Sequence, residues 1–320
     1  AVVLVRGLGE ALETFWVKRS DALPFMPGFH AFLGGKMDAQ DAELEVTGAE
    51  NEFDRASRAC AIRESFEEAG VLVGLDPPAD AASDPRLTDL APAREALLAG
   101  RVTFPALASE RGWRFRAGAL TPAGRWTTPP FASQRFEACY FLARVPRGQE
   151  PSIVPGELAS GEWVRPLAAL ERYRRGEAVF AAPILWTLIA LAEGEENLPE
   201  RLALGPARSA APVPRIELTW GIVLHAMPTR PLPPATHTNA YLVGEKEVAL
   251  IDPGSADPVA LAELFGLIEQ VFVPNGGDGD RVGVLAAQHQ RDVAGQQQLQ
   301  AEHHHGDDHQ RGNHHQQAAD

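Results

Sequence analysis

The stretch Arg55–Gly70, RASRACAIRESFEEAG, decides the fold prediction for this chain. Its apolar side chains share the spacing of one helix face, and they are Ala59, Ile62, Phe66 and Ala69. A glycine follows directly, which is the residue that most often ends a helix. The sequence therefore predicts an amphipathic helix that ends at Gly70.

Three carboxylates lie on the side of this predicted helix that faces away from the apolar stripe. Glu64 and Glu68 are four residues apart, and Glu67 lies three after Glu64. Carboxylates crowded in this way repel one another, and a hard divalent cation such as Mg²⁺, which prefers oxygen ligands, would offset that repulsion. The alternative interpretation is an acidic helix face that is simply solvated. The helix pattern by itself does not distinguish a cation site from such a face.

The wider pattern resembles the Nudix hydrolase box, G-x5-E-x7-R-E-U-x-E-E-x-G-U, in which U is an aliphatic residue. The positions that match its second half are Arg63, Glu64, Glu67, Glu68, Gly70 and Val71. Ser65 departs from the box, because an aliphatic residue is usual there. The residues that match the second half of the box therefore lie on the predicted helix or directly after it.

The first half of the box corresponds to Gly35 followed after five residues by Asp41, which replaces the usual glutamate. Between Asp41 and Arg63 lie 21 residues where the box has seven, an insertion of about 14. The acidic residues 36–54 belong to this insertion. Such a long box is similar to the subgroup that includes peroxisomal coenzyme A diphosphatases. The Gly34-Gly35 pair resembles the family's Phe-Pro-Gly-Gly entry, with Leu33 in place of proline.

The resemblance implies an α+β fold, a Nudix α/β/α sandwich with a mixed sheet. It implies that Mg²⁺ or Mn²⁺ is held by the carbonyl of Gly35 and the carboxylates of Glu64, Glu67 and Glu68. It also implies that Arg63 pairs with an acidic residue such as Asp41 and braces the loop. An exposed arginine without a role is the alternative for Arg63.

A further glutamate is expected near the last strand of such a fold, where many family members have a metal ligand or general base. Glu157 holds this place, and Glu162 and Glu137 are the alternatives. Family resemblance assigns this role, because a general base must satisfy a geometry that sequence does not show.

The reaction implied is attack of water on a phosphorus of a nucleoside diphosphate derivative. The subgroup favours coenzyme A or acyl-CoA as the substrate. ADP-ribose, nucleotide sugars and oxidised nucleotides stay open. A Nudix-fold binding module without turnover is a different class of protein, and the complete set of three glutamates argues against it.

Periodicity predicts further elements around the helix. A hairpin is expected over residues 1–19, and strands are expected at 71–75, 136–145 and 157–166. Helical stretches are expected at 92–111, 167–175 and 183–192. The opening residues AVVLV already have the character of a core strand, so we expect the natural start of the protein to lie upstream.

We divide the chain into a Nudix domain at 1–196, a Pro- and Ala-rich linker at 197–214, a β-rich segment at 215–273 and a His- and Gln-rich tail at 274–320. The tail lacks apolar periodicity and is predicted to be disordered. In the third segment, Thr238–Val243 together with Ile251–Gly254 resembles the opening of a metallo-β-lactamase-fold domain.

Such a domain should continue with the ligand motif H-x-H-x-D-H. The nearest candidate, HHHGDDH at 303–309, has one residue too many and lies in the tail. We therefore expect a partial metallo-β-lactamase-like segment. A metallo-β-lactamase-type thioester or ester hydrolase with a Nudix companion is the rival function.

The amino-acid composition restricts the classes of molecule that we expect this protein to bind. The chain has 29 basic and 43 acidic residues and a net charge of −14, which argues against a nucleic-acid surface. No apolar run approaches the roughly 20 residues that span a bilayer, so we expect no membrane partner. Two distant cysteines favour a reducing compartment, and we expect a cytoplasmic protein. The oligomeric state stays open.

Overall fold

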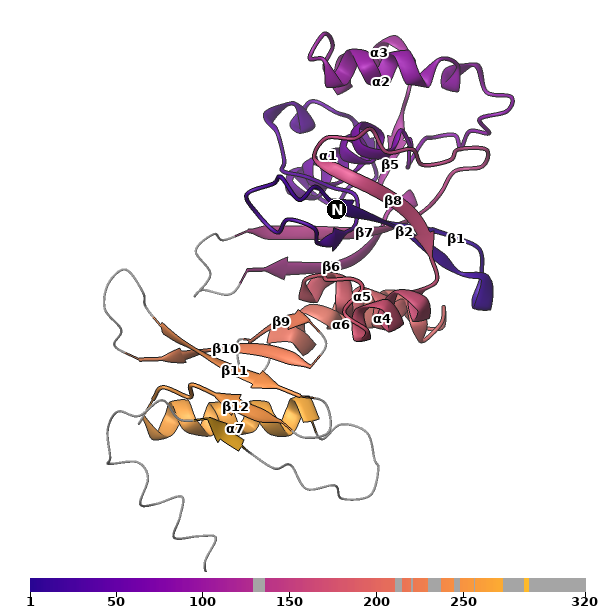
Figure 1. The fold of residues 1–320 in the computed structure, drawn as a ribbon. Coiled ribbons are helices and arrows are strands. Elements are labelled where there is room, and N and C mark those ends of the chain that lie inside the picture. The colour runs from indigo at the N-terminus through magenta and orange to yellow at the C-terminus, as the bar shows by residue number, and fades with distance from the viewer. Residues whose placement is uncertain are drawn as a thin grey trace, which may run out of the picture.

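A computed structural model gives the fold (Figure 1). It contains two main sheets, of which the first has a hydrophobic core on each face and the second has one core. The residues it describes are 1–128, 136–210, 215–219, 221–229, 237–244, 248–255, 257–272 and 285–287.

The first sheet has six strands in the order β3-β2-β1-β7-β6, with β8 also paired to β2. The strands β1 and β2 form the predicted antiparallel hairpin, whereas β1 and β7 run parallel, so the sheet is mixed. Strands predicted at 136–145 and 157–166 are confirmed as β7 and β8. The bounds are β1 Val2–Arg6, β2 Glu13–Arg19, β3 His30–Ala31, β6 Thr121–Thr127, β7 Glu137–Arg144 and β8 Leu158–Val164.

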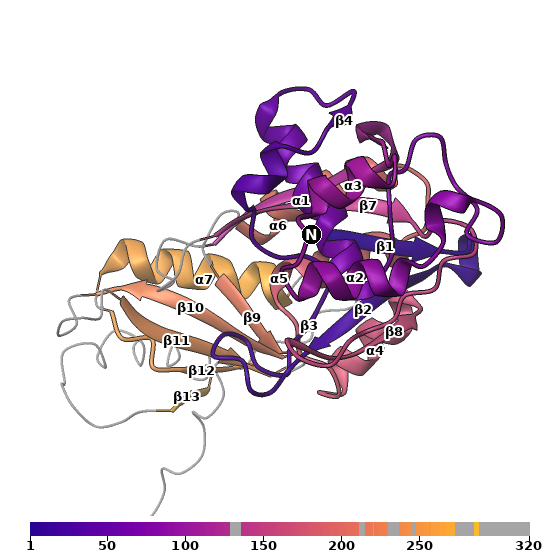
Figure 2. The same ribbon diagram turned by 90° about the horizontal axis from the view of Figure 1, so that it is seen from above.

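The two faces of this sheet contact different cores, because side chains of a strand alternate in direction. Along β1, Val2 and Leu4 pack into the core that contains α1 (Glu52–Ala69). Val3 and Val5 pack into the core that contains α4 (Pro166–Arg174) and α5 (Ala182–Ala192). Figures 1 and 2 show the sheet between these helices. The layered α+β architecture expected from the sequence is therefore observed.

The decisive helix forms as predicted. Ala59, Ile62, Phe66 and Ala69 are all fully buried. The helix α1 begins a little earlier than the quoted stretch, because the Asn51 side chain accepts a hydrogen bond from the Asp54 N–H and caps it. It ends at Gly70, whose φ of 71° lies in the left-handed region that favours glycine.

Two segments after α1 differ from expectation. Residues 71–75 are mostly buried, but the predicted strand there is wrong, since these residues form only an isolated bridge between Leu75 and Phe115. The backbone N–H of Leu72 donates instead to the side chain of Gln149. Residues 92–111 are helical in two pieces, α2 (Leu90–Leu98) and α3 (Phe104–Glu110).

Short elements complete this part of the chain. They are 3₁₀ helices at Gly9–Ala11, Ala39–Ala42, Pro85–Leu87 and Ala117–Ala119, with a small parallel ladder of β4 (Val46–Thr47) and β5 (Phe115–Arg116). The helix at Ala39–Ala42, η2, lies in the acidic insertion and bears on the site described below.

The segment 197–214, predicted as a linker, contains the helix α6 (Leu198–Ala210). Leu198 and Leu202, one turn apart, are buried in the same core as α5. The prediction missed this helix because Pro206 lies inside it and weakens the sequence signal. Packing against the sheet and α5 stabilises a helix that propensity alone does not favour.

The second sheet has the order β13-β12-β11-β10-β9, with α7 (Pro258–Phe272) packed against it. The strands are β9 Arg215–Thr219, β10 Ile222–Pro228, β11 His237–Val243, β12 Ala249–Ile251 and β13 Leu285–Ala287. Strand β13 falls in the predicted disordered tail, so that prediction is wrong for these three residues, which pair parallel to β12. The candidate ligands at 303–309 lie outside the described residues.

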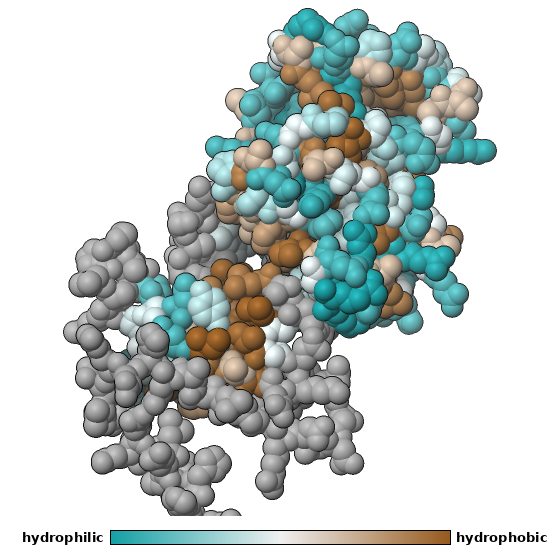
Figure 3. All heavy atoms as spheres, viewed as in Figure 1, coloured by the Kyte–Doolittle hydropathy of each residue, from teal (hydrophilic) through white to brown (hydrophobic). Residues whose placement is uncertain are grey.

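Apolar side chains gather on the visible face of this second unit, as the space-filling view in Figure 3 shows. The exposed large apolar residues of α7 are Val259 and Phe265. The metallo-β-lactamase resemblance of this unit stays a prediction. Over the described part of the chain, no helix combines the length and the apolar character that crossing a membrane requires.

Candidate functional site

Arg63 is the centre of the carboxylate cluster on α1. Its side chain is only 6% exposed. Its Nε and Nη2 donate to the two carboxylate oxygens of Asp41 at 2.7 and 3.0 Å. Nη2 also donates to the carbonyl of Lys36 at 3.1 Å. This two-pronged pairing is the geometry that suits a planar guanidinium.

Asp41 lies in η2 with a side chain that is only 2% exposed. It also accepts a hydrogen bond from the Asp38 N–H at 2.8 Å, in a reciprocal cap at the start of this short helix. The predicted Arg63–Asp41 pair is therefore confirmed. The alternative, an exposed arginine without a role, is wrong.

Arg63 also holds two of the three glutamates. Its Nη1 donates to Glu64 at 2.8 Å and to Glu67 at 2.9 Å. One guanidinium thus fixes both carboxylates relative to the helix and to the acidic insertion.

Glu68 is held from the other side by the glycine turn. Its carboxylate accepts a hydrogen bond from the Gly34 N–H at 2.7 Å. Gly35 lies against Glu64, and a Cβ at this position would be 2.4 Å from Glu64 Oε1. A side chain at Gly35 would therefore displace the Glu64 carboxylate, which Arg63 holds in place. The structure brings together Gly35, Glu64 and Glu68 as the sequence predicted.

The electrostatics of the cluster follow from its burial. Burial raises the pKa of Glu64 and Glu67, and the neighbouring Arg63 opposes this rise. Burial raises the pKa of Glu68 to about 8, and the Gly34 N–H opposes this rise. Three half-buried carboxyls with raised pKa values are a site where added positive charge is favourable.

A divalent cation fits the chemistry of these donors. Glu64 and Glu68 offer carboxylate oxygens beside the Gly34-Gly35 turn, and oxygen ligands suit Mg²⁺. Among the residues that the structure describes, however, no group of three or more His, Cys, Asp or Glu is arranged as a metal ligand set. In this arrangement Glu64 and Glu67 are paired with Arg63.

Two residues near the cluster were missed by the sequence analysis. The thiol of Cys60 lies 3.9 Å from the carbonyl oxygen of Gly35, and burial raises its pKa to about 12. Cys60 is one helical turn before Glu64, so spacing on the predicted helix could have indicated it. Arg94 donates from Nε to the carbonyl of Glu67 at 2.9 Å, and no local sequence signal links these residues.

The three candidates for an additional glutamate lie in different surroundings. Glu157 is exposed just before β8, and its charge contributes to the raised pKa of Glu68. Glu162 accepts hydrogen bonds from Arg172 and Trp16, and Glu137 pairs with Arg125. Of these three residues, Glu157 is the one whose charge contributes to the pKa of Glu68. The role of Glu157 as metal ligand or general base stays a prediction.

Comparison with known proteins identifies the family. A model of the NUDT19 Nudix domain matches residues 48–191. The crystal structure of a Nudix hydrolase from Alicyclobacillus acidocaldarius superposes with a TM-score of 0.51 at 30% identity, covering 64% of this chain and 96% of that one. The chain belongs to the Nudix hydrolase family. Members of this family are enzymes that act on diphosphate bonds.

Curated Nudix relatives are more distant. The acyl-coenzyme A diphosphatase NUDT19 of Xenopus laevis is 22% identical over 225 residues, which cover 56% of this chain and 59% of the relative. A nudix hydrolase of Caenorhabditis elegans is 25% identical over 177 residues, 55% of each chain. This Nudix chain thus spans little more than half the length of these two relatives.

Replacing Arg63 tests whether its buried ion pair with Asp41 stabilises the fold. In Arg63→Met the buried carboxylate of Asp41 loses its partner, and we expect the free energy of unfolding to fall by about 3–5 kcal/mol, the range for breaking a buried ion pair. Denaturant unfolding measures this change. The matched control is Arg101→Met, which removes an exposed pair with Glu95 and should cost about 0–1 kcal/mol. Equal losses in the two variants would contradict the assignment.

The raised pKa of Glu68 predicts a pH-dependent stability in metal-free protein. Between its ordinary value of 4.5 and about 8, the folded chain holds a proton that the unfolded chain has released. Stability therefore falls as pH rises through this window. Thermal unfolding in a chelator at pH 5 to 8 should show a decline of Tm that is weaker in Glu68→Gln. Added Mg²⁺ should raise the Tm of the native protein most near pH 8. Identical pH profiles for both proteins would refute the assignment to Glu68.

Proposed function

We propose that this protein is a Mg²⁺- or Mn²⁺-dependent hydrolase that cleaves the diphosphate linkage of a nucleoside diphosphate derivative, with coenzyme A or acyl-CoA as the favoured substrate. The observation that carries the proposal is the position of Glu64 and Glu68 against the Gly34-Gly35 turn. The name of the Xenopus relative, an acyl-coenzyme A diphosphatase, supports the choice of substrate.

The proposed metal ligands are the carbonyl of Gly35 and the carboxylates of Glu64, Glu67 and Glu68. When bound, the cation would neutralise charge on the phosphate oxygens and lower the pKa of a coordinated water. Arg63 has a positioning role, because it holds Glu64 and Glu67 and ties them to the acidic insertion through Asp41.

Glu157 is the proposed general base. It is exposed, lies on the segment before β8 and acts electrostatically on Glu68. Its carboxylate would take the proton from a water molecule as that oxygen forms a bond to phosphorus. The bond from this phosphorus to the bridging oxygen breaks, and the leaving phosphate carries away the electron pair.

The substrate class follows from the family and from the acidic character of the chain. The net charge of −14 does not favour a polyanionic nucleic acid, whereas a small substrate can be held through a bound cation. ADP-ribose and nucleotide sugars are the alternative substrates. The free cysteines Cys60 and Cys139 support a reducing location, for which we propose the cytoplasm.

Replacing Glu68 tests the chemistry. Glu68→Gln keeps an oxygen that can accept from the Gly34 N–H but removes the carboxylate charge, so turnover should fall by about 100-fold or more. A Mg²⁺-dependent phosphate-release screen over coenzyme A, ADP-ribose, nucleotide sugars and nucleoside triphosphates measures it. The control is Glu52→Gln, an exposed change in the first turn of the same helix. Full activity of Glu68→Gln would remove Glu68 from the site, and Zn²⁺-dependent thioester hydrolysis that survives this change would favour the rival function.

Replacing Gly35 tests the turn. In Gly35→Ala the added methyl group would meet the Glu64 carboxylate, which must then move from its position beside the turn. We expect the apparent affinity for Mg²⁺ in the activity assay to weaken by roughly tenfold or more, in line with losses from disturbed metal surroundings. Gly118→Ala is the control, because nothing lies within 4 Å of a Cβ there. Unchanged Mg²⁺ dependence would show that the turn does not shape the metal site.

A further inference from the structure

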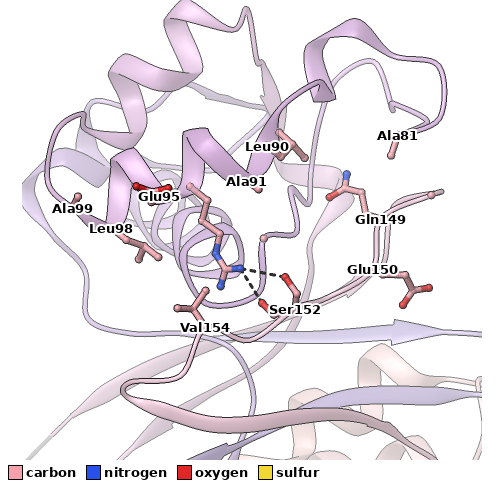
Figure 4. A pocket seen from close by; sticks show the side chains of 13 residues that line it. Ala81, Leu90, Ala91, Glu95, Leu98, Ala99, Gln149, Glu150, Ser152 and Val154 are labelled. Atoms are coloured by element: carbon pink, nitrogen blue, oxygen red, sulfur yellow. Dashed lines mark hydrogen bonds between the residues drawn. The ribbon is translucent and has the colours of Figure 1, made fainter.

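A cavity lies at the C-terminal end of α1, where Gly70 lines it. It has a volume of about 730 Å³, within the range of small-molecule sites. Figure 4 shows it between α2 and the segment that carries Gln149, Glu150 and Ser152. Its apolar wall is formed by Leu90, Leu98 and Val154 together with alanines. An apolar chain therefore suits most of its surface.

The wall also contains the buried cation Arg94, which is only 6% exposed. Its Nε donates to the Glu67 carbonyl, and its Nη1 donates to the carbonyl and hydroxyl of Ser152 at 2.9 and 3.3 Å. The dashed lines in Figure 4 mark the bonds to Ser152. Its Nη2 is shielded from solvent and has no hydrogen-bond partner among the described residues.

Gln149 provides a second donor of the same kind. Its Oε1 accepts from the buried N–H of Leu72 at 2.8 Å, which fixes the orientation of the amide. Its Nε2 is buried and lacks a partner within the described part of the chain. Buried polar groups are almost always hydrogen-bonded, so two unpartnered donors at one cavity indicate an acceptor that comes from outside the chain.

The positive charge of Arg94 indicates that this external acceptor is an anion. Among the described residues Arg94 forms no ion pair with a carboxylate, although the charge of Glu68 acts on it. The two acidic residues at the cavity have other partners, since Glu95 pairs with Arg101 and Glu150 pairs with Arg6. A desolvated guanidinium that forms no ion pair favours binding of an anionic oxygen.

We propose that this cavity binds a small amphipathic anion, with a carboxylate or phosphate head held by Arg94 and a short apolar chain along Leu90, Leu98 and Val154. The side chain of Val154 is 54% exposed, so this wall can move aside as the head reaches Nη2. The site is separate from the diphosphate chemistry, and the proposal does not depend on the proposed function.

Calorimetric titration of the full chain tests the proposal, with octanoate, octyl phosphate and 1-octanol as probes. We expect at least one of the two anions to bind at least tenfold more tightly than 1-octanol, and the tighter one identifies the head group. Arg94→Met, which keeps the apolar stem, should weaken the anion by about tenfold or more, and Arg94→Lys should restore part of the loss. Failure of both anions to bind the native protein would overturn the proposal.

A second variant covers the case in which Arg94→Met does not fold. Val154→Asp changes an exposed residue at the cavity and places a negative charge beside the proposed head group, so anion binding should weaken by about tenfold. Leu167→Asp is the matched control, because Leu167 is 66% exposed on α4 and does not line the cavity. Equal anion affinity in these two variants would overturn the proposal, as would equal affinity of the native protein for the anions and 1-octanol.

Discussion

The buried ion pair between Arg63 and Asp41 is the interaction on which the site depends. A buried charge is stable only when it is paired and hydrogen-bonded, and this guanidinium has acceptors at both ends of its fork. One end fixes the acidic insertion at Asp41, and the other orients Glu64 and Glu67. The insertion is therefore anchored to α1 although it lengthens the box. Substitution of glutamate by the shorter Asp41 is accommodated because η2 brings that residue to the arginine.

The mixed sheet is what makes this arrangement rigid. Alternate residues of β1 contact α1 on one face and the α4–α5 layer on the other, so the helix has a fixed support. The glycine turn then lies against the helix through Gly34 and Gly35. Burial of the carboxylates raises their pKa values, which is unfavourable for the isolated fold. The cation-dependent function that we propose gives a physical reason to retain such a cluster.

How far sequence reasoning reached can be followed in particular residues. The apolar stripe of α1 was predictable because its period is local and uninterrupted. The pairing of Arg63 with Asp41 was predictable only through family resemblance. Residues 71–75 look like a strand but fill a core without strand partners, and α6 is hidden by Pro206. In both cases packing, which period and propensity do not describe, decided the outcome.

The sequence by itself determined the helix, the side on which Glu64, Glu67 and Glu68 lie, and the family that this pattern resembles. These follow from local spacing, since neighbours along a helix are fixed by its geometry. Only the tertiary structure decided that the Gly34 N–H meets Glu68, that Cys60 lies near Gly35, and that Arg94 reaches the Glu67 carbonyl beside a cavity. Contacts between distant segments depend on how helices and loops pack on the sheet, and no local pattern in the chain records that packing.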